Sequence, residues 1–405
     1  MSALERSERR RTPLAQTLKK IRWAYRLNAN WKAAALKRRY NSALSYYARR
    51  TLSSDFRRLL EGRAGPRLAR LGDIGRLHIF FLGTDALQDK SGILQALGRC
   101  GEMVHFTRAD GSYGQYTHDS ESERRRANTE RLWALFASLH ASGKTPNLLI
   151  AQTWAGFVNP EVFGRIAGEY GTVVVNIGMD DRHQYWGRKV NGEWRGTRGL
   201  IPYIDLALTA APECVEWYLK ENCPALFFPE ASDPKIFHPI PGLLKEHEVC
   251  FVGARYGVRE RIVTRLRKAG VKVSAFGQGW EGGRIGVEDV PRLFAQSKIV
   301  LGVGTVGHCS DFYALKMRDF DGPMSGSFYL THDNPDLYRL YDIGNEIATY
   351  RTVEECVDRV RYYLEHDKER EDIARRGRER AVREHTWDKR FSDLIALLTR
   401  GLPNC

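Results

Sequence analysis

From residue 77 onward, short apolar runs alternate with amphipathic stretches of helical period. Residues 91–99, 121–142 and 212–221 have the apolar spacing of helices. Six runs of strand length surround them: 77–82, 103–106, 147–151, 172–177, 204–209 and 225–228. Buried strands that alternate with helices are typical of a parallel α/β sheet. We therefore predict a first α/β domain over residues 76–228.

A proline-rich segment separates this domain from a second one. Residues 229–242 contain four prolines, and we predict a linker over 229–245, a second α/β domain over 246–386, and a C-terminal helix and tail over 387–405. The alternation repeats, with strands at 247–252, 271–276, 299–303, 327–331 and 346–350, helices at 257–269, 290–297 and 353–365, and a helical tail over 367–400. The pattern predicts two Rossmann-like domains that face each other across a ligand-binding cleft.

The segment before the first strand has a different pattern. Residues 12–60 lack glycine, and Lys and Arg fill many of the positions between apolar residues. Two stripes have helical spacing: Leu14, Leu18, Ile21 and Tyr25 in one, and Trp23, Leu27 and Trp31 in the other. We predict a basic helical extension over 1–75, with one or two amphipathic helices closed by a turn at 61–66.

Composition narrows the class of protein. A hydrophobic fraction of 42% over 405 residues supports two cores. No run approaches the roughly 18 apolar residues of a membrane span, and the charged N-terminus lacks the apolar core of a secretion signal. The seven cysteines are scattered without a Cys-x-x-Cys pair, which argues against a zinc site or disulfide framework. We expect a cytoplasmic protein in a reducing compartment.

The net charge of +14 is concentrated in the N-terminal extension. Residues 1–76 hold 20 Lys and Arg against 5 Asp and Glu, whereas residues 77–405 hold 43 against 44. A basic helix with Trp, Tyr and Leu is typical of a segment that docks on an anionic membrane, here through residues 1–60 at the inner face. Packing of the extension on the body or on a second subunit is an equal alternative. RNA binding ranks third, because the sequence contains no recognised nucleic-acid module.

Glycine-containing loops follow the strands of the second domain, where open parallel sheets bind their ligands. Gly253, Arg255 and Arg259 follow the strand at 247–252 and lead into a helix. Glycine lets the backbone approach a phosphate, while the helix N-terminus and the arginines attract an anion. An ordinary strand-to-helix turn with surface arginines is the alternative.

Two further loops have similar features. Gly277, Gln278 and Trp280 follow the next strand, and Trp280 could stack on a base, with a packing tryptophan in a turn as the alternative. Gly304 and Thr305 lie in the glycine-dense loop 302–308, which could wrap a diphosphate or sugar; a flexible connector is the alternative.

The stretch 315–331 is the most informative in the chain. Arg318 precedes Asp321 by three residues, Gly326 follows five residues later, and the apolar run 328–330 comes next. This pattern predicts a helix that ends at Gly326 and leads directly into a buried strand. A carboxylate on such a helix can accept hydrogen bonds from a ribose diol, and the nearby arginine can hold phosphate.

This stretch resembles the donor-binding signature of GT-B glycosyltransferases. More narrowly, it resembles the group 1-like family of the spore maturation protein type, whose pattern is Arg-x-Phe-Glu with glycine five residues after the Glu. Asp321 stands where the family has Glu, and the resemblance implies that it binds ribose. Many relatives have an acid about eight residues earlier that touches the donor sugar; here Tyr313 occupies that place and Asp311 lies two residues away.

The resemblance extends over roughly residues 204–395. The segment 228–237 is similar to the family's interdomain segment, and the stretches at 333–337, 353–355, 361–364, 373–380 and 385–387 are similar to its C-terminal run. The fold implied is GT-B, with the acceptor bound by the first domain and a nucleotide-diphosphate sugar by the second.

The first domain should supply a catalytic base if the reaction needs one. Asp85 follows the first strand, and Asp180, Asp181 and His183 follow the strand at 172–177. A loop-capping role is the alternative for each. We expect no essential metal and no cofactor, because GT-B sites generally stabilise the leaving diphosphate with Arg, Lys and helix dipoles.

The favoured function is transfer of a hexosyl group from a nucleotide sugar to a glycan, lipid-linked or protein acceptor, as in polysaccharide biosynthesis. A non-catalytic GT-B-like scaffold that acts through the basic extension is the alternative from another class. A sugar epimerase of GT-B type is a more remote alternative, and nucleic acid is not an expected partner.

Overall fold

The apolar runs of the first domain form one six-stranded parallel sheet in a computed structural model that describes residues 22–52, 54–73 and 76–400. The strand order is β2-β1-β3-β4-β7-β8. Its strands are β1 (His78–Leu82), β2 (Glu102–His105), β3 (Leu148–Ala151), β4 (Val173–Gly178), β7 (Leu206–Thr209) and β8 (Ala225–Phe227). Every residue of β3, β4 and β7 is buried, as continuous apolar strands require when helices cover both faces of a sheet.

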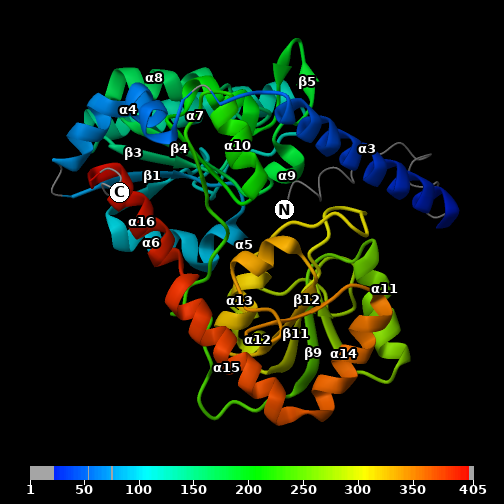
Figure 1. The fold of residues 1–405 in the computed structure, drawn as a ribbon. Helices are drawn as coiled ribbons and strands as arrows, with labels where there is room; N and C mark the ends of the chain where they lie inside the picture. Colours follow the sequence, from blue (N-terminus) through cyan, green and yellow to red (C-terminus); the bar gives the residue numbers. More distant parts are fainter. Residues whose placement is uncertain (1–21, 53, 74–75, 401–405) are drawn as a thin grey trace.

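Helices connect these strands and cover the sheet (Figure 1). They are α5 (Ala86–Gln88), α6 (Leu94–Cys100), α7 (Glu121–Ala141), α8 (Glu161–Tyr170), α9 (Asp181–Gln184) and α10 (Pro212–Lys220), with the irregular turns η1 (Asp89–Ile93) and η2 (Thr197–Tyr203). A small hairpin, β5 (Lys189–Val190) with β6 (Glu193–Trp194), projects from the domain.

The second domain repeats this plan with a five-stranded parallel sheet in the order β10-β9-β11-β12-β13. Its strands are β9 (His247–Val252), β10 (Val273–Phe276), β11 (Ser297–Leu301), β12 (Phe328–His332) and β13 (Ala348–Tyr350). Its helices are α11 (Val258–Lys268), α12 (Val290–Ala295), α13 (Arg318–Met324), α14 (Val353–Glu365) and α15 (Asp367–Glu384), with the short turn η3 (Pro335–Arg339). The prediction of two Rossmann-like domains is confirmed.

The C-terminal end of the chain returns to the first domain. Helix α16 (Trp387–Arg400) packs on α6, and Figure 1 shows it passing from the lower domain to the upper one. The predicted helical tail over 367–400 is interrupted at His385 and Thr386, and α16 begins at Trp387. There the backbone hydrogen-bonds to Ser232 of the linker on both sides, which interrupts the helix where the chain changes domain.

The N-terminal extension forms two helices, α3 (Arg22–Ala48) and α4 (Phe56–Gly72). The predicted turn at 61–66 is wrong, because α4 continues through it with Pro66 inside the helix. Arg63 donates to the carbonyls of Ile201 and Ile204, at 2.6 and 2.7 Å, and such tertiary contacts override the weak helix propensity of nearby glycines. The chain turns earlier, just before Asp55, whose carboxylate caps α4.

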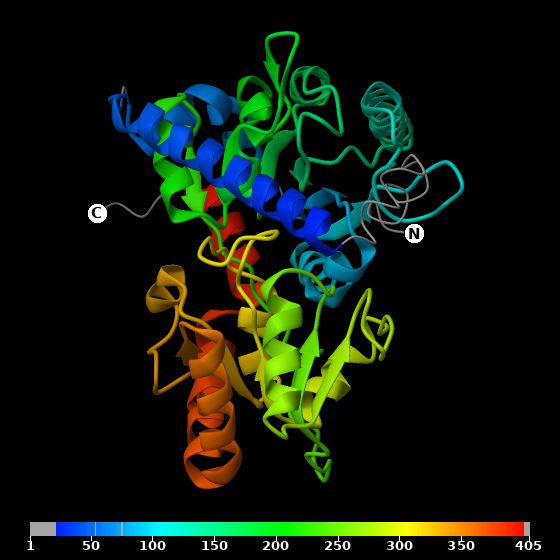
Figure 2. The same ribbon diagram turned by 90° about the vertical axis from the view of Figure 1, so that its right-hand side faces the viewer.

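Helix α3 packs along the body and reaches both domains (Figure 2). Near its C-terminal end, Tyr47 is buried against Trp217 of the first domain, and its hydroxyl donates to Glu221 at 2.9 Å. Near its middle, Ala33 and Leu36 pack on the loop 305–313 of the second domain. Packing on the body is therefore observed for this part of the extension. Leu14, Leu18, Ile21, Trp23 and Tyr25 lie outside the residues whose side chains the structure describes.

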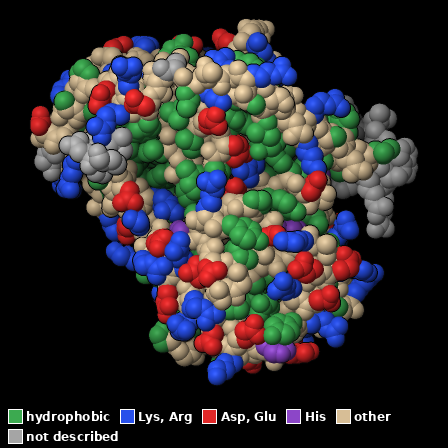
Figure 3. Space-filling model, viewed as in Figure 1, with side chains coloured by type: hydrophobic (Ala, Val, Ile, Leu, Met, Phe, Trp, Pro, Cys, Tyr) green, Lys and Arg blue, Asp and Glu red, His purple; other side chains and the backbone are tan. Residues whose placement is uncertain are grey.

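The surface agrees with the nearly neutral charge of the body. Figure 3 shows basic and acidic side chains interspersed over the lower domain. Within the described ranges, no helix has both the length and the apolarity that crossing a membrane requires.

Candidate active site

The loops after β9 and β10 are fastened to each other at the carboxyl end of the second sheet. The amide of Gly253 donates to the carbonyl of Phe276, and that of Arg255 to the carbonyl of Gln278, both at 2.8 Å. Gly277 has a positive φ of 124°, and a Cβ there would lie 2.5 Å from the Gly253 oxygen, so only glycine fits. The predicted Gly253 and Gly277 loops thus form one rigid wall.

Trp280 packs beneath these two loops and stabilises them. Its ring is buried against Phe251, and its indole nitrogen donates to the Gly253 carbonyl at 2.8 Å. The Arg255 guanidinium lies over the same ring and pairs with Glu260 at 2.8 Å. Both side chains therefore have partners within the second domain.

Two arginines converge on Gly253 without an acidic hydrogen-bond partner. A Cβ at Gly253 would lie 3.4 Å from an Nη1 atom of both Arg259 and Arg318. Arg259 comes from the first turn of α11 and Arg318 from the start of α13. The Nε of Arg259, and the Nε and Nη2 of Arg318, are buried with no hydrogen-bond partner. Such donors suit an anion with several oxygens, such as a diphosphate.

The closeness of the two arginines affects the pKa of Arg259. Burial, together with the neighbouring Arg318, lowers the pKa of Arg259 to about 10. Arg259 therefore stays cationic at neutral pH, and burying its charge beside a second guanidinium group is unfavourable until an anion joins them.

The two acids of the signature helix are bonded differently. Asp319 accepts from the Tyr329 hydroxyl at 2.6 Å and from the Lys316 amide at 2.7 Å, so it fixes α13 to β12. Asp321 has one buried carboxylate oxygen with no hydrogen-bond partner, and burial raises its pKa well above its usual range. Gly326, at φ 76°, separates α13 from β12, which confirms the predicted helix end and strand.

The third predicted loop forms a short bridge from Thr305 to Tyr313. Gly304 accepts from the Ala314 amide at 3.0 Å, and the Thr305 hydroxyl is buried with no partner. Asp311 pairs with Lys37 of α3. The acid nearest to the expected sugar-binding position thus contacts the N-terminal helix.

Residues from the first domain and the linker face the signature helix. His183 lies on α9 with its Nε2 3.8 Å from Asp180, and burial lowers its pKa although Asp180 opposes this. Glu230 of the linker is buried with one unpartnered oxygen, and burial raises its pKa to about 7. Lys316 is close enough to influence the pKa of both groups. The sequence analysis assigned no role to Glu230 or Lys316, whose only signal was that Glu230 lies in the predicted linker and Lys316 in the signature stretch.

The remaining base candidates lie in different surroundings. Asp181 is fully buried and accepts from the hydroxyls of Thr197 and Tyr218, at 2.6 and 3.0 Å. Asp85 accepts from the Leu87 amide at 2.9 Å and caps α5. Of the four candidates, His183 is the one whose pKa responds to a charged residue of the second domain, Lys316, and Asp180 lies beside it.

Comparisons with known proteins agree with this geometry. Residues 259–396 match the family described as glycosyl transferase-like. Sucrose-phosphate synthase from Thermosynechococcus elongatus has a similar structure, with a TM-score of 0.58 at 10% identity over 80% of this chain and 99% of that one. HepE from Anabaena, in complex with UDP-glucose, gives a TM-score of 0.57 at 11% identity over the same shares. The chain has the GT-B glycosyltransferase fold. No curated protein sequence matches it.

In this GT-B frame, the family match covers Arg259, Arg318 and Asp321. Arg259 and Arg318 converge beyond the carboxyl end of the second sheet, the edge at which open α/β folds bind nucleotides, and the charge of Arg318 acts on the buried Asp321 carboxyl. Among the residues that the structure describes, no group of His, Cys, Asp and Glu side chains is arranged to hold a metal ion.

Proposed function

We propose that this protein transfers a hexosyl group from a nucleotide-diphosphate sugar to a glycan, lipid-linked or protein acceptor. The observation that carries the proposal is the convergence of Arg259 and Arg318 on Gly253, within electrostatic reach of the buried Asp321 carboxyl, one oxygen of which has no hydrogen-bond partner. The arginines would bind the diphosphate and Asp321 the ribose diol. The Arg-x-Phe-Asp sequence ending at Asp321 further supports membership of the spore maturation type within the group 1-like family.

The chemistry follows from these positions. The acceptor hydroxyl attacks the anomeric carbon, and the bond from that carbon to the diphosphate oxygen breaks. His183 takes the hydroxyl proton, because its lowered pKa keeps it neutral and able to accept, and Asp180 stabilises the resulting cation. Arg259 and Arg318 neutralise the charge that develops on the nucleoside diphosphate. Since these cations do the work of a metal ion, we propose that turnover needs neither a metal nor a cofactor.

The donor class can be identified by thermal-shift measurements with UDP, GDP, ADP, CMP and dTDP and their common sugars. We expect one nucleoside diphosphate to stabilise the protein selectively, because ligand binding to the folded state raises its stability. HepE binds UDP-glucose, which makes UDP the first candidate. Folded protein that none of these nucleotides stabilises would favour the non-catalytic scaffold.

The variant Asp321→Ala tests the ribose contact. Losing a hydrogen-bond acceptor for the diol should weaken nucleotide binding by about 10-fold to 30-fold, measured by calorimetric titration with the nucleotide found in the screen. Asp358→Ala, an exposed acid on α14 of the same domain, is the matched control and should bind normally. Unchanged affinity in a folded Asp321→Ala variant would remove the assignment.

We also propose that the acceptor is presented at an anionic membrane surface. Leu27, Trp31, Ala34 and Arg38 recur at helical spacing on one face of α3 and are all exposed, with Leu27 at 60% and Trp31 at 70%. An amphipathic aromatic ring flanked by basic residues is suited to the headgroup region.

Vesicle co-sedimentation tests this docking on the full chain. We expect binding to vesicles with an anionic lipid and not to purely zwitterionic ones, and a decrease of about 10-fold in Leu27→Ala/Trp31→Ala. Leu244→Ala removes a leucine that is even more exposed, at 75%, from the segment before the second domain's first strand and should bind like the wild type. Equal binding by all three proteins would show that this face of α3 does not dock.

A further inference from the structure

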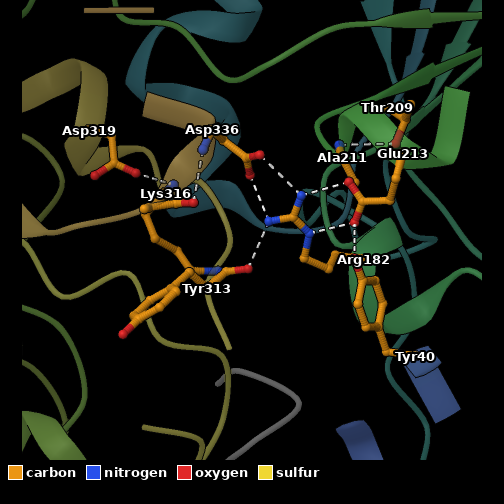
Figure 4. A network of polar contacts seen from close by, with 10 residues as sticks. Tyr40, Arg182, Thr209, Ala211, Glu213, Tyr313, Lys316, Asp319 and Asp336 are labelled. Atoms are coloured by element: carbon orange, nitrogen blue, oxygen red, sulfur yellow. Dashed lines mark hydrogen bonds and ion pairs between the residues drawn. The ribbon is translucent and has the colours of Figure 1, made fainter. Parts of the chain in front are cut away.

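Arg182 joins the two domains, and each nitrogen of its guanidinium donates a hydrogen bond (Figure 4). Its Nε and Nη2 donate to the two oxygens of Glu213, both at 2.7 Å. Its Nη1 donates to Asp336 at 2.7 Å and to the Tyr313 carbonyl at 3.0 Å, and Nη2 also reaches Asp336 at 3.2 Å. Glu213 belongs to the first domain, whereas Asp336 and Tyr313 belong to the second.

The contacts are enclosed rather than superficial. The Arg182 side chain is 12% exposed. Burial alone would lower its pKa, but Glu213 and Asp336 raise the pKa of Arg182 above its usual range, so the guanidinium stays charged. Planar, bidentate pairing to two carboxylates fixes distance and direction at once, which a flexible ammonium group does not do. Tyr40 of α3 donates to Glu213 at 3.0 Å and supports the same cluster.

The position of this cluster connects the two halves of the candidate site. Arg182 directly precedes His183 on the single turn of α9. Tyr313 lies in the segment that leads into Lys316 and α13. A change in the Arg182 contacts therefore moves the proposed base relative to the residues proposed to hold the donor, and a displacement of about 1 Å is enough to slow a reaction strongly.

We propose that Arg182 is a positioning residue that fixes the location of the acceptor-side His183 relative to the donor-side residues 313–318. The inference rests on the proposed glycosyl transfer for its kinetic consequence. All the hydrogen bonds of Arg182 go to protein groups, and it acts by holding Tyr313 and Asp336 of one domain to Glu213 of the other.

Arg182→Lys tests the kinetic consequence, since lysine keeps the charge but cannot bind Glu213, Asp336 and the Tyr313 carbonyl together. We expect kcat to fall about 10-fold, with nucleotide affinity unchanged because the proposed nucleotide contacts lie in the second domain. Asp336→Asn should lower kcat similarly, and the double variant should be no slower than the slower single one. Arg195→Lys is the control: Arg195 is 9% exposed and pairs with Glu121 inside the first domain.

A distance measurement tests the contact without relying on turnover. Spin labels on encoded amino acids at Lys144 and Lys368, exposed positions in different domains, report how the domains are arranged. We expect a broader distance distribution in Arg182→Lys than in the wild type or Arg195→Lys. An unchanged distribution would overturn the inference whether or not the protein is a transferase, and so would equal losses of kcat and nucleotide affinity. Absence of nucleotide binding by the wild type would instead count against the proposed function.

Discussion

Replacing Arg318 with methionine should weaken nucleoside diphosphate binding by about 100-fold, which corresponds to about 3 kcal/mol, without lowering the thermal midpoint of the ligand-free protein. The loss is large because Arg318 offers two buried, unpartnered donor atoms beside Gly253, and charge-assisted bonds to phosphate are among the strongest available to a side chain. Arg259 alone would remain to neutralise the diphosphate.

The stability should be unchanged because Arg318 has no acidic hydrogen-bond partner to lose and lies beside another buried arginine. In the ligand-free protein, Arg318 adds a second positive charge to the buried Arg259 and contributes to its lowered pKa. Methionine keeps an unbranched apolar stem over the Phe251 ring and removes that repulsion. Loss of binding without loss of stability separates a ligand site from a structural ion pair, whose loss would weaken both.

Calorimetric titration and thermal unfolding of the same preparations measure the two effects. Arg265→Met is the matched control, since Arg265 is an exposed residue of α11 that pairs with Glu354 at 3.1 Å away from the loop. It should bind nucleotide normally. Wild-type affinity in Arg318→Met, or a midpoint that falls by several degrees, would show that Arg318 serves the fold.

The sequence predicted the architecture because each sheet is built from local signals. Apolar runs such as 147–151 and 299–303 are long enough to be strands and too short to be helices, and Pro229 to Gly242 interrupts the alternation once. The prediction from sequence failed at α4 and at His385, where long-range contacts determine whether the backbone is helical. Arg63 stabilises a helix through glycine-rich sequence, and Ser232 breaks one that its own residues favour.

The site divides in the same way. Arg318, Asp321 and Gly326 were found because they lie within nine residues and form a recognisable spacing. Arg182 was not found, since its partners Glu213 and Asp336 lie 31 and 154 residues away and nothing in the spacing connects them. Glu230 was missed because its importance comes from burial, which a single acid in a linker does not reveal. Polar contacts between the domains can be identified only once the fold is known.

Replacing Asp181 with asparagine should stabilise the protein at pH 8 and reduce the dependence of its stability on pH. Burial raises the pKa of Asp181 to about 7, although Thr197 and Tyr218 donate to its carboxylate. In the unfolded chain the same group loses its proton near pH 4. Between these values the folded protein holds one more proton than the unfolded chain, so stability falls as pH rises from about 4 to about 7.

The expected size follows from the displaced pKa. At about 1.4 kcal/mol for each pKa unit, the ionised carboxylate costs the folded state about 4 kcal/mol above pH 7. Asparagine resembles the protonated form and pays no such cost. At pH 8 the variant should therefore be more stable by about 2 to 4 kcal/mol. The lower value applies if the asparagine forms poorer hydrogen bonds with the two hydroxyls than the carboxyl group does. Near pH 4 the two proteins should differ little.

Urea unfolding from pH 4 to pH 8 measures this difference directly. Some slope should remain in the variant, because burial also raises the pKa of Asp89 and of Glu230 to about 7. Asp180→Asn controls for removing an acid at the same strand end, where the Asp180 side chain is 43% exposed. A variant that is less stable than the wild type at pH 8 would mean that Asp181 is held as a carboxylate. The proposed base His183 would then have a buried negative charge two residues away, and its own pKa would have to be reconsidered.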